Sequence, residues 1–165
     1  MGFSICRSGM TKMTEQISSE TPSVAIRQML PKDFGSVADL TSQLGYPCGA
    51  ADITRRYALL ADRVDAQLLV AEHVNLGIVG WIHVQELYLL ESDTRAEIWG
   101  LVVAESARGS GVGRRLVEAA EAWAVGRGLR MMGLRSNVLR VDARAFYERL
   151  GYRIVKTQNA FRKGL

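Results

Sequence analysis

The sequence predicts a single α/β (α+β) domain, because apolar residues alternate along short β-like runs and recur at helical spacing between those runs. Of its 165 residues, 48% are hydrophobic and 23% are charged, which is the composition of an ordinary globular domain. A chain of this length buries roughly two thirds of its unfolded surface, enough for one core. We expect residues 23–165 to form this domain and the polar residues 1–22 to form a flexible tail.

The first half of the chain predicts one strand, two helices and a hairpin. Residues 24–29 alternate like a strand, and residues 31–44 begin with proline and carry apolar side chains at helical spacing. A second helix is expected over residues 50–61. Two β-rich runs, residues 67–72 and 78–84, flank an Asn-Leu-Gly sequence that suits a hairpin turn.

The second half of the chain alternates strands with helices. Glycines end both of its predicted helices, which favours a sharp stop at each helix terminus. The expected elements are, in order, a strand over residues 96–103, a helix over 112–126, a buried strand over 129–134, a helix over 143–150, and closing strands over 152–155 and 160–162.

Between the strand at 96–103 and the next helix lies Arg-Gly-Ser-Gly-Val-Gly, residues 108–113. Glycines let the backbone turn sharply, so that successive N–H groups converge on a ligand at the start of the helix. A Walker loop is excluded because two arginines follow Gly113, and the dinucleotide fingerprint fails because its third glycine would fall on Arg114 or Leu116. The segment predicts a phosphate or pyrophosphate site, with a glycine-rich turn that binds nothing as the alternative.

This segment matches the Arg/Gln-x-x-Gly-x-Gly/Ala signature of the GNAT superfamily of N-acetyltransferases, in which the loop holds the pyrophosphate of acetyl-coenzyme A (acetyl-CoA). Residues 101–103 resemble the strand before that loop, and residues 143–152, ARAFYERLGY, resemble the family's late helix. The resemblance implies a mixed and strongly twisted sheet of six to seven strands flanked by about four helices. It also implies that the strand ending near Val103 splays away from the strand beginning near Leu129.

The resemblance assigns the acetyl-CoA contacts to the strand end, the loop and the late helix. Asn137 departs from the family pattern, because the usual asparagine lies where Arg140 stands in this chain. Arg144 likewise stands where relatives often carry histidine. The expected contacts are Leu101, Val102, Val103, Arg108, Gly109, Ser110, Gly111, Val112, Gly113, Arg114, Asn137 and Tyr147.

Transfer of an acetyl group to an amine needs a base, because a free alkylamine has a pKa near ~10.4 and is mostly protonated at neutral pH. Glu97 is the best candidate. It lies on the strand that leads into the loop, and simple alternation puts it on the same face as Trp99 and Leu101. A salt bridge at the sheet edge is an equal alternative. Glu86 and Glu72 are weaker candidates on neighbouring strands.

The leaving thiolate needs a proton, and the oxyanion needs hydrogen-bond donors. Tyr147 is the expected acid, since a model phenol has a pKa of ~10 against ~8.5 for a thiol. Without the loop, Tyr147 would be interpreted as one more core residue beside Phe146. Main-chain N–H groups of residues 101–103 are the expected oxyanion donors where the strands part.

The acceptor side is the least informative part of the sequence. The resemblance builds it from the first two helices and the middle strands, where we expect Trp81 and Trp99 in the core and His83 as an ordinary strand residue. Residues 46–48, Tyr-Pro-Cys, are expected to form a surface turn, with a lid over the acceptor as the alternative. No substrate follows from these residues beyond a small-molecule or peptide amine.

The charge distribution fits an anionic cofactor. Residues 95–165 hold 14 Lys and Arg against 6 Asp and Glu, a net charge of +8, and residues 1–94 hold 7 against 11, a net charge of −4. The positive charge forms no continuous run and accompanies no nucleic-acid module, so we expect no nucleic-acid partner. Two histidines and two cysteines offer no ligand spacing for a metal and no paired nucleophile.

We therefore predict an acetyl-CoA-dependent N-acetyltransferase that moves the acetyl group to a primary amine by direct transfer in a ternary complex. The alternative is a catalytically silent protein of the same fold that binds or senses acyl-CoA. No apolar run approaches the roughly 20 residues that span a bilayer, so a soluble cytoplasmic protein without membrane partners is expected. Homodimers are common in the family, and the sequence leaves this possibility open.

Overall fold

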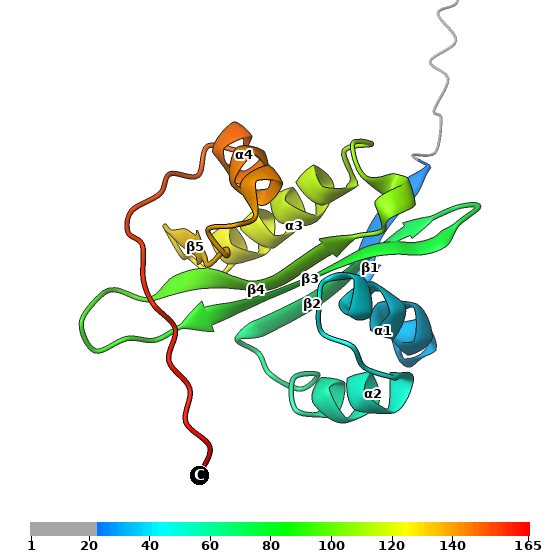
Figure 1. The fold of residues 1–165 in the computed structure, drawn as a ribbon, viewed down its shortest axis with the longest axis horizontal. Helices are drawn as coiled ribbons and strands as arrows, with labels where there is room; N and C mark the ends of the chain where they lie inside the picture. The colour runs from blue at the N-terminus through cyan, green and yellow to red at the C-terminus, as the bar shows by residue number, and fades with distance from the viewer. Residues whose placement is uncertain (1–22) are drawn as a thin grey trace, which may run out of the picture.

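A computed structural model describes residues 23–165; the tail expected over residues 1–22 lies outside the described residues. One five-stranded sheet carries helices on both faces (Figure 1). Helices α1 (Phe34–Gln43) and α2 (Ala50–Ala58) cover one face, and α3 (Val112–Gly126) and α4 (Val141–Arg149) lie on the other. The predicted α/β class and the four helices are confirmed.

The strands follow one another across the sheet in the order in which they occur along the chain. The first four are antiparallel, and the fifth joins the fourth in parallel, so that α3 serves as the crossover between them. The strands are β1 (Val24–Gln28), β2 (Ala66–His73), β3 (Gly77–Leu87), β4 (Arg95–Val103) and β5 (Met132–Leu134).

The larger core lies between α3 and the sheet. Val112, Leu116, Ala120 and Ala124 recur every four residues along α3, and each is at most 4% exposed. They pack with buried strand residues such as Ile82 in one apolar cluster. Because a fully buried large aliphatic side chain stabilises the fold by about 1.5–3 kcal/mol, this stripe fixes α3 on the sheet.

A second core lies under α1 and α2. Phe34 and Val37 of α1 and Ile53 of α2 pack against Val70 of β2, with Trp81 of β3 at the edge of the cluster. Both helices end before their predicted limits, α1 at Gln43 rather than at residue 44 and α2 at Ala58 rather than at residue 61. This core holds the two helices over the middle of the sheet.

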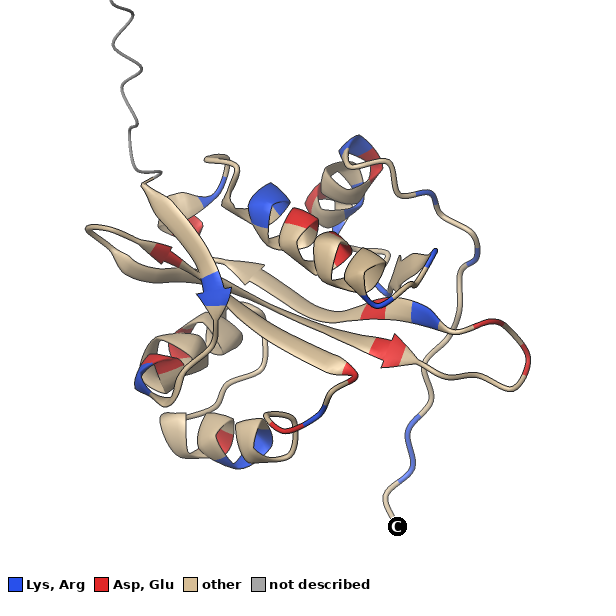
Figure 2. Ribbon diagram, turned by 180° about the vertical axis from the view of Figure 1, so that it is seen from behind, with Lys and Arg blue, Asp and Glu red and all other residues tan. Residues whose placement is uncertain are grey.

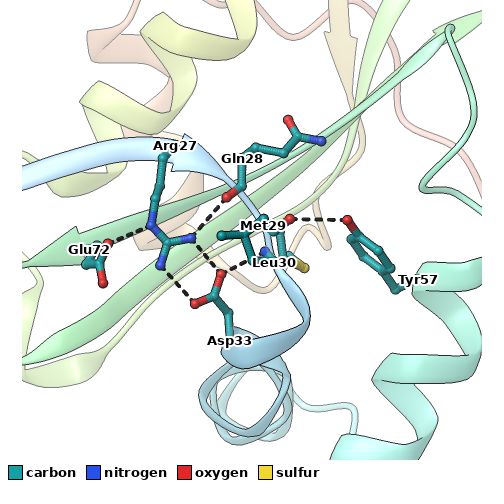
Figure 3. A network of polar contacts seen from close by, with 7 residues as sticks. All are labelled: Arg27, Gln28, Met29, Leu30, Asp33, Tyr57 and Glu72. Carbon is teal, nitrogen blue, oxygen red and sulfur yellow. Dashed lines mark hydrogen bonds and ion pairs between the residues drawn. The ribbon is translucent and has the colours of Figure 1, made fainter.

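Arg27 of β1 ties the start of α1 to β2 (Figure 3). Its guanidinium donates to both carboxylate oxygens of Asp33, at 2.7 and 2.8 Å, and to Glu72 Oε2 at 2.6 Å. Asp33, which is 3% exposed, also accepts the main-chain N–H of Leu30 at 2.8 Å. The hydrogen bonds from Arg27 hold the pKa of the Asp33 carboxyl below its ordinary value.

The two closing strands predicted over residues 152–155 and 160–162 do not form, so the sheet has five strands rather than six or seven. The segment runs out beside the domain after α4 (Figure 1). Ile154, Val155 and Phe161 are 59%, 90% and 90% exposed. Strand β5 is also shorter than the strand expected over 129–134, is only partly buried, and pairs with β4 over three residues. Because a strand needs a partner edge, so short a strand offers little for a closing strand to pair with.

Within residues 23–165, no helix has both the length and the apolar character that crossing a lipid bilayer requires.

We expect Asp33→Ala to lower the free energy of unfolding by about 3 kcal/mol, because it leaves the Arg27 charge with an incomplete set of partners in a half-buried site. Urea denaturation followed by circular dichroism measures the change. The matched control is Asp39→Ala, an exposed aspartate within α1, for which we expect a change within about 0.5 kcal/mol. Equal effects of the two substitutions would contradict the role assigned to the network.

Candidate active site

Strand β4 changes its partners along its length. Residues 96–98 pair with both β3 and β5, whereas residues 100–103 pair with β3 alone among the described strands. Within the β3–β4 ladder, Ile98 lies opposite Val84 and Gly100 lies opposite His83, so Trp99 is one extra residue. This β-bulge bends β4. Strands β4 and β5 therefore part after Ile98, as the resemblance implies.

The bulge also changes which side chains share a face of the sheet. Ala96 and Ile98 belong to the cluster under α3, and beyond the bulge Leu101 and Val103 pack against the same cluster. Glu97 therefore lies on the opposite face from Leu101, and the prediction from simple alternation that they share a face is wrong. One inserted residue shifts the period of two by one position.

The main chain of the last part of β4 faces the open edge. The N–H of Ala104 donates to the Val79 carbonyl of β3 at 2.8 Å. The N–H and carbonyl of the preceding residue, Val103, therefore point to the opposite edge of β4, away from β3. Arg108 Nε donates to the Val103 carbonyl there, at 3.3 Å. Because alternate residues of a strand face the same edge, the N–H of Leu101 faces the opening as well.

The glycine loop (residues 108–113) joins β4 to α3 and has the shape of an anion site. Gly109 and Gly111 adopt φ values of 76° and 85°, in the left-handed region that favours glycine. No side chain caps α3, and Arg115 N–H is the first to bond within it, to Gly111 O at 3.1 Å. The N–H groups of residues 112–114, here called the main-chain cradle, therefore lack helical acceptors and fit a pyrophosphate.

The third glycine of the loop serves packing. A Cβ on Gly113 would lie 3.2 Å from Cζ and 3.3 Å from Cε2 of Phe146, and 3.6 Å from Cγ2 of Val103. A side chain at residue 113 would press on the ring of Phe146, so glycine at this position suits the close approach of α4 to the start of α3. The contact also sets the position of Tyr147, the next residue of α4.

The side chains of the loop hold its own shape. Ser110 Oγ donates to the Ala107 carbonyl at 2.6 Å, and Arg108 lies 3.5 Å from Glu105. Arg114 lies 3.9 Å from Glu118 on the surface of α3. Basic residues gather at this first turn of α3 and along the C-terminal segment (Figure 2). A ligand at the loop therefore meets main-chain N–H groups, with the arginines of the first turn of α3 beside them.

Tyr147 lies in an aromatic cluster on α4. Its ring centre is 5.0 Å from that of Phe146 and 5.6 Å from that of Tyr152, with both pairs close to edge-on. Burial raises the pKa of the Tyr147 hydroxyl to about 12. The hydroxyl therefore stays protonated at neutral pH and is available as a proton donor.

Glu97 is 3% exposed, and both of its oxygens face arginines. Arg95 Nε donates to Oε2 at 3.2 Å, and Arg135 Nε lies 3.4 Å from Oε1. The side chain of Arg135 is 66% exposed and extends over the ring of Trp99, at 5.7 Å from its centroid. Glu97 therefore forms ion pairs, and one of its two partners lies at the surface.

Asn137 occupies a turn of its own before α4. Its Oδ1 accepts the N–H of Leu139 at 2.9 Å, and its carbonyl accepts the N–H of Arg140, also at 2.9 Å. The side-chain oxygen is thus used locally, which leaves the NH₂ group to face a ligand.

The two weaker carboxylate candidates hold other parts of the fold together. Glu86 accepts hydrogen bonds from Tyr88 and from Arg127 Nε, the latter at 2.6 Å, beside the end of α3. Glu72 belongs to the Arg27 network on β2. The structure brings neither carboxylate to the opening of β4.

A cavity of about 150 Å³ lies between the helix pair α1–α2 and the sheet, and sequence reasoning missed it. Apolar side chains line most of it, together with Trp81, His83 and Arg56. Tyr57, which also lines it, donates to the Met29 carbonyl at 3.2 Å and so ties α2 to the end of β1 (Figure 3).

Two residues expected to be ordinary carry buried polar atoms beside this cavity. Trp81 Nε1 and His83 Nε2 are buried without a hydrogen-bond partner among the described residues. Burial lowers the pKa of His83 to about 4, so its ring is neutral at pH 7. The spacing of these two residues, which puts both on one face of β3, was the available sequence signal.

The decisive comparison is with a family model. Residues 34–152 match the model described as the acetyltransferase (GNAT) family. The chain belongs to this family. It is accordingly an N-acetyltransferase that uses acetyl-CoA as cosubstrate, and the predictions of family, fold class, enzyme class and cosubstrate are confirmed. The curated proteins contain no match to the chain.

Solved structures of similar fold cover nearly the whole described domain. A transcriptional regulator from Bacillus halodurans C-125 is 24% identical, with a TM-score of 0.75 over 85% of this chain and 99% of its own. The aminoglycoside 6'-N-acetyltransferase AAC(6')-Ih from Acinetobacter baumannii is 16% identical, with a TM-score of 0.74 over 86% and 99%. AAC(6')-Iy in complex with a bisubstrate analog is 18% identical, with a TM-score of 0.74 over 86% and 99%. At these identities the likeness shows the fold alone.

Proposed function

We propose that this GNAT acetyltransferase moves the acetyl group from acetyl-CoA directly to a primary amine within one ternary complex. One observation carries the proposal: the main-chain cradle, the open edge of β4 and Tyr147 are neighbours, tied together by the contact between Gly113 and Phe146. AAC(6')-Iy binds a bisubstrate analog in which the CoA sulfur is joined to a second group, and this supports direct transfer in a ternary complex here.

The chain's own groups supply the binding contacts. The cradle and the guanidinium groups of Arg108 and Arg114 would hold the pyrophosphate, because N–H donors at a helix start and positive charge both favour an anion. The NH₂ of Asn137 and the main chain of residues 101–103 would bond the pantetheine amides. The N–H of Leu101, which faces the opening, would stabilise the oxyanion.

Glu97 would accept the proton of the amine. Arg135, its exposed partner at 3.4 Å, can be displaced by an incoming ammonium group that carries the same charge. Once Glu97 takes that proton, the neutral nitrogen attacks, the C–N bond forms and the C–S bond breaks. Tyr147 would give its proton to the departing sulfur, because its raised pKa keeps the hydroxyl protonated.

Direct transfer is favoured over an acetyl-enzyme by the residue types at the opening. Glu97, residues 101–103 and Tyr147 offer a carboxylate, amides and a protonated phenol. Cys48, the free thiol among residues 23–165, lies in the connection between α1 and α2. Release of free thiol from acetyl-CoA over a panel of primary amines tests the proposal, and acetyl-CoA binding without release for any amine would contradict it.

We expect Gly111→Asp to abolish acetyl-CoA binding, measured by calorimetry, because the new carboxylate would repel the phosphates and residue 111 has a φ of 85°. The matched control is Gly77→Asp. It carries the same charge and similar strain, at a φ of 68°, at the first residue of β3. Normal binding by Gly111→Asp, or an equal loss in both variants, would count against the cradle.

Tyr147→Phe should lower kcat by roughly 100-fold while leaving the KM for acetyl-CoA within about twofold, because it removes a proton donor and keeps the ring. The control is Tyr152→Phe, a neighbouring ring whose hydroxyl donates to Glu121 at 2.8 Å. We expect that variant to lose stability but to keep its turnover. Unchanged thiol release by Tyr147→Phe would remove the acid role.

Glu97→Gln should lower kcat roughly 100-fold at neutral pH and lose less as the pH rises, because the amine then deprotonates in solution. Glu86→Gln, a second buried and arginine-paired glutamate, is the control for mere loss of an ion pair. Stopped-flow thiol release across pH measures both. A pH-independent deficit, equal in the two variants, would assign Glu97 to the ion pair only.

A further inference from the structure

We propose that Arg135, held against Trp99, binds a carboxylate that the acceptor carries next to its amine, so that the acceptor is an amino acid rather than a simple amine. The inference rests on the proposed function, because it names the substrate class for the same transfer. Three features of the structure support it: the place of the two residues in the sheet, the balance of charge around Glu97, and the short distance across the ion pair that the acceptor would separate.

Trp99 and Arg135 lie where strands β4 and β5 begin to part. Ile98 and Leu134 are the last pair of the β4–β5 ladder, and Trp99 and Arg135 are the residues that follow them along the chain. The guanidinium carbon of Arg135 is 5.7 Å from the centroid of the Trp99 ring, so a cation–π contact joins the two strands at the start of the opening. Both residues are at least half exposed, and a ligand reaches them from solvent.

The carboxylate of Glu97 lies beside this contact, over the glycine of β5. A Cβ on Gly133 would lie 2.8 Å from Glu97 Oε2 and 3.3 Å from Arg95 Nε, so the missing side chain makes room for both groups. The side chain of Arg95 is 23% exposed, whereas that of Arg135, on the Oε1 side, is 66% exposed. Arg135 is therefore the partner that an incoming group can replace.

The charges around Glu97 favour an acceptor that brings a negative group. Two guanidinium groups, those of Arg95 and Arg135, already face this one carboxylate. An acceptor with only an ammonium group would add a third positive charge and leave Arg135 beside it without a partner. An acceptor that also carries a carboxylate would leave the net charge unchanged, because its ammonium pairs with Glu97 and its carboxylate pairs with Arg135.

The distance across the ion pair sets the spacing of charges in the acceptor. Arg135 Nε and Glu97 Oε1 are 3.4 Å apart, and the contact with Trp99 holds the guanidinium near this place. An ammonium and a carboxylate that take the place of one such pair must lie close together, as they do on the same carbon of an α-amino acid. The planar guanidinium binds both oxygens of a carboxylate and so would also fix the direction of the amine.

Acetylation itself would weaken the hold of this site on the product. As the C–N bond forms and the C–S bond breaks, the nitrogen loses two protons. One leaves to solvent through Glu97, and the other is balanced by the proton that the departing sulfur gains. The N-acetylamino acid keeps its carboxylate but no positive charge, so it no longer pairs with Glu97, and Arg135 can return to that carboxylate.

The experiment compares two pairs of acceptors by thiol release from acetyl-CoA with the full-length protein. L-alanine against L-alaninamide tests the carboxylate, and L-norleucine against its isomer ε-aminocaproate tests the spacing of the charges. We expect kcat/KM to be roughly 10-fold higher for the first member of each pair. The amide has the less basic amine and so offers more neutral amine at neutral pH, which means that a preference for alanine cannot arise from basicity.

The outcomes separate this inference from the proposed transfer. A kcat/KM for alaninamide or ε-aminocaproate equal to or above that of its partner would overturn the inference while leaving the transfer intact. Turnover of other primary amines, with neither amino acid accepted, would do the same. No thiol release with any primary amine, while acetyl-CoA still binds, would overturn the proposed transfer itself.

Variants assign the preference to Arg135. Arg135→Gln should bring the ratio of alanine to alaninamide close to one without changing the KM for acetyl-CoA. The matched control is Arg127→Gln, because Arg127 also pairs with a buried glutamate, Glu86, at 2.6 Å beside the end of α3, and this variant should keep the ratio. Calorimetric binding of L-alanine to the protein saturated with CoA gives a readout without turnover and should weaken roughly 10-fold in Arg135→Gln. An unchanged ratio and unchanged alanine affinity in folded Arg135→Gln would overturn the inference.

Discussion

Trp99 is an extra residue in the β3–β4 ladder, and the geometry of the whole site depends on it. The bulge bends β4 away from β5 after three paired residues, which leaves an edge of main chain without a strand partner. The same insertion moves Glu97 to the face opposite Leu101. A single local irregularity thus exposes amides on one side and aligns a carboxylate with Trp81 and His83 on the other.

The cofactor side depends on a different constraint, the absence of side chains. Gly109 and Gly111 allow the left-handed turns that aim N–H groups at a ligand, whereas Gly113 allows the ring of Phe146 to lie against the start of α3. Position 113 therefore couples the anion site to α4. A side chain there would press on the ring of Phe146, which is the neighbour of Tyr147 on α4.

The sequence predicted well those features of the fold that depend only on residues close together along the chain. The loop 108–113 was recognisable because backbone turning and helix starts are local properties, and the apolar stripe of α3 was recognisable by its period. The face of Glu97 was missed because a bulge depends on how β4 pairs with β3. The closing strands were missed because alternation in residues 152–165 does not supply a partner edge. The cavity depends on how two helices cross the sheet, which no single segment encodes.

The proposed base gains a further property from its partners. Glu97 is buried between Arg95 and Arg135, so a bare amine in solution finds its carboxylate already paired. An acceptor bound at the site would present its ammonium group at a high local concentration and would compete with the exposed guanidinium of Arg135. Proton acceptance would then depend on correct seating of the acceptor. The ion pair between Glu97 and Arg135 would then make transfer selective for amines that the site positions.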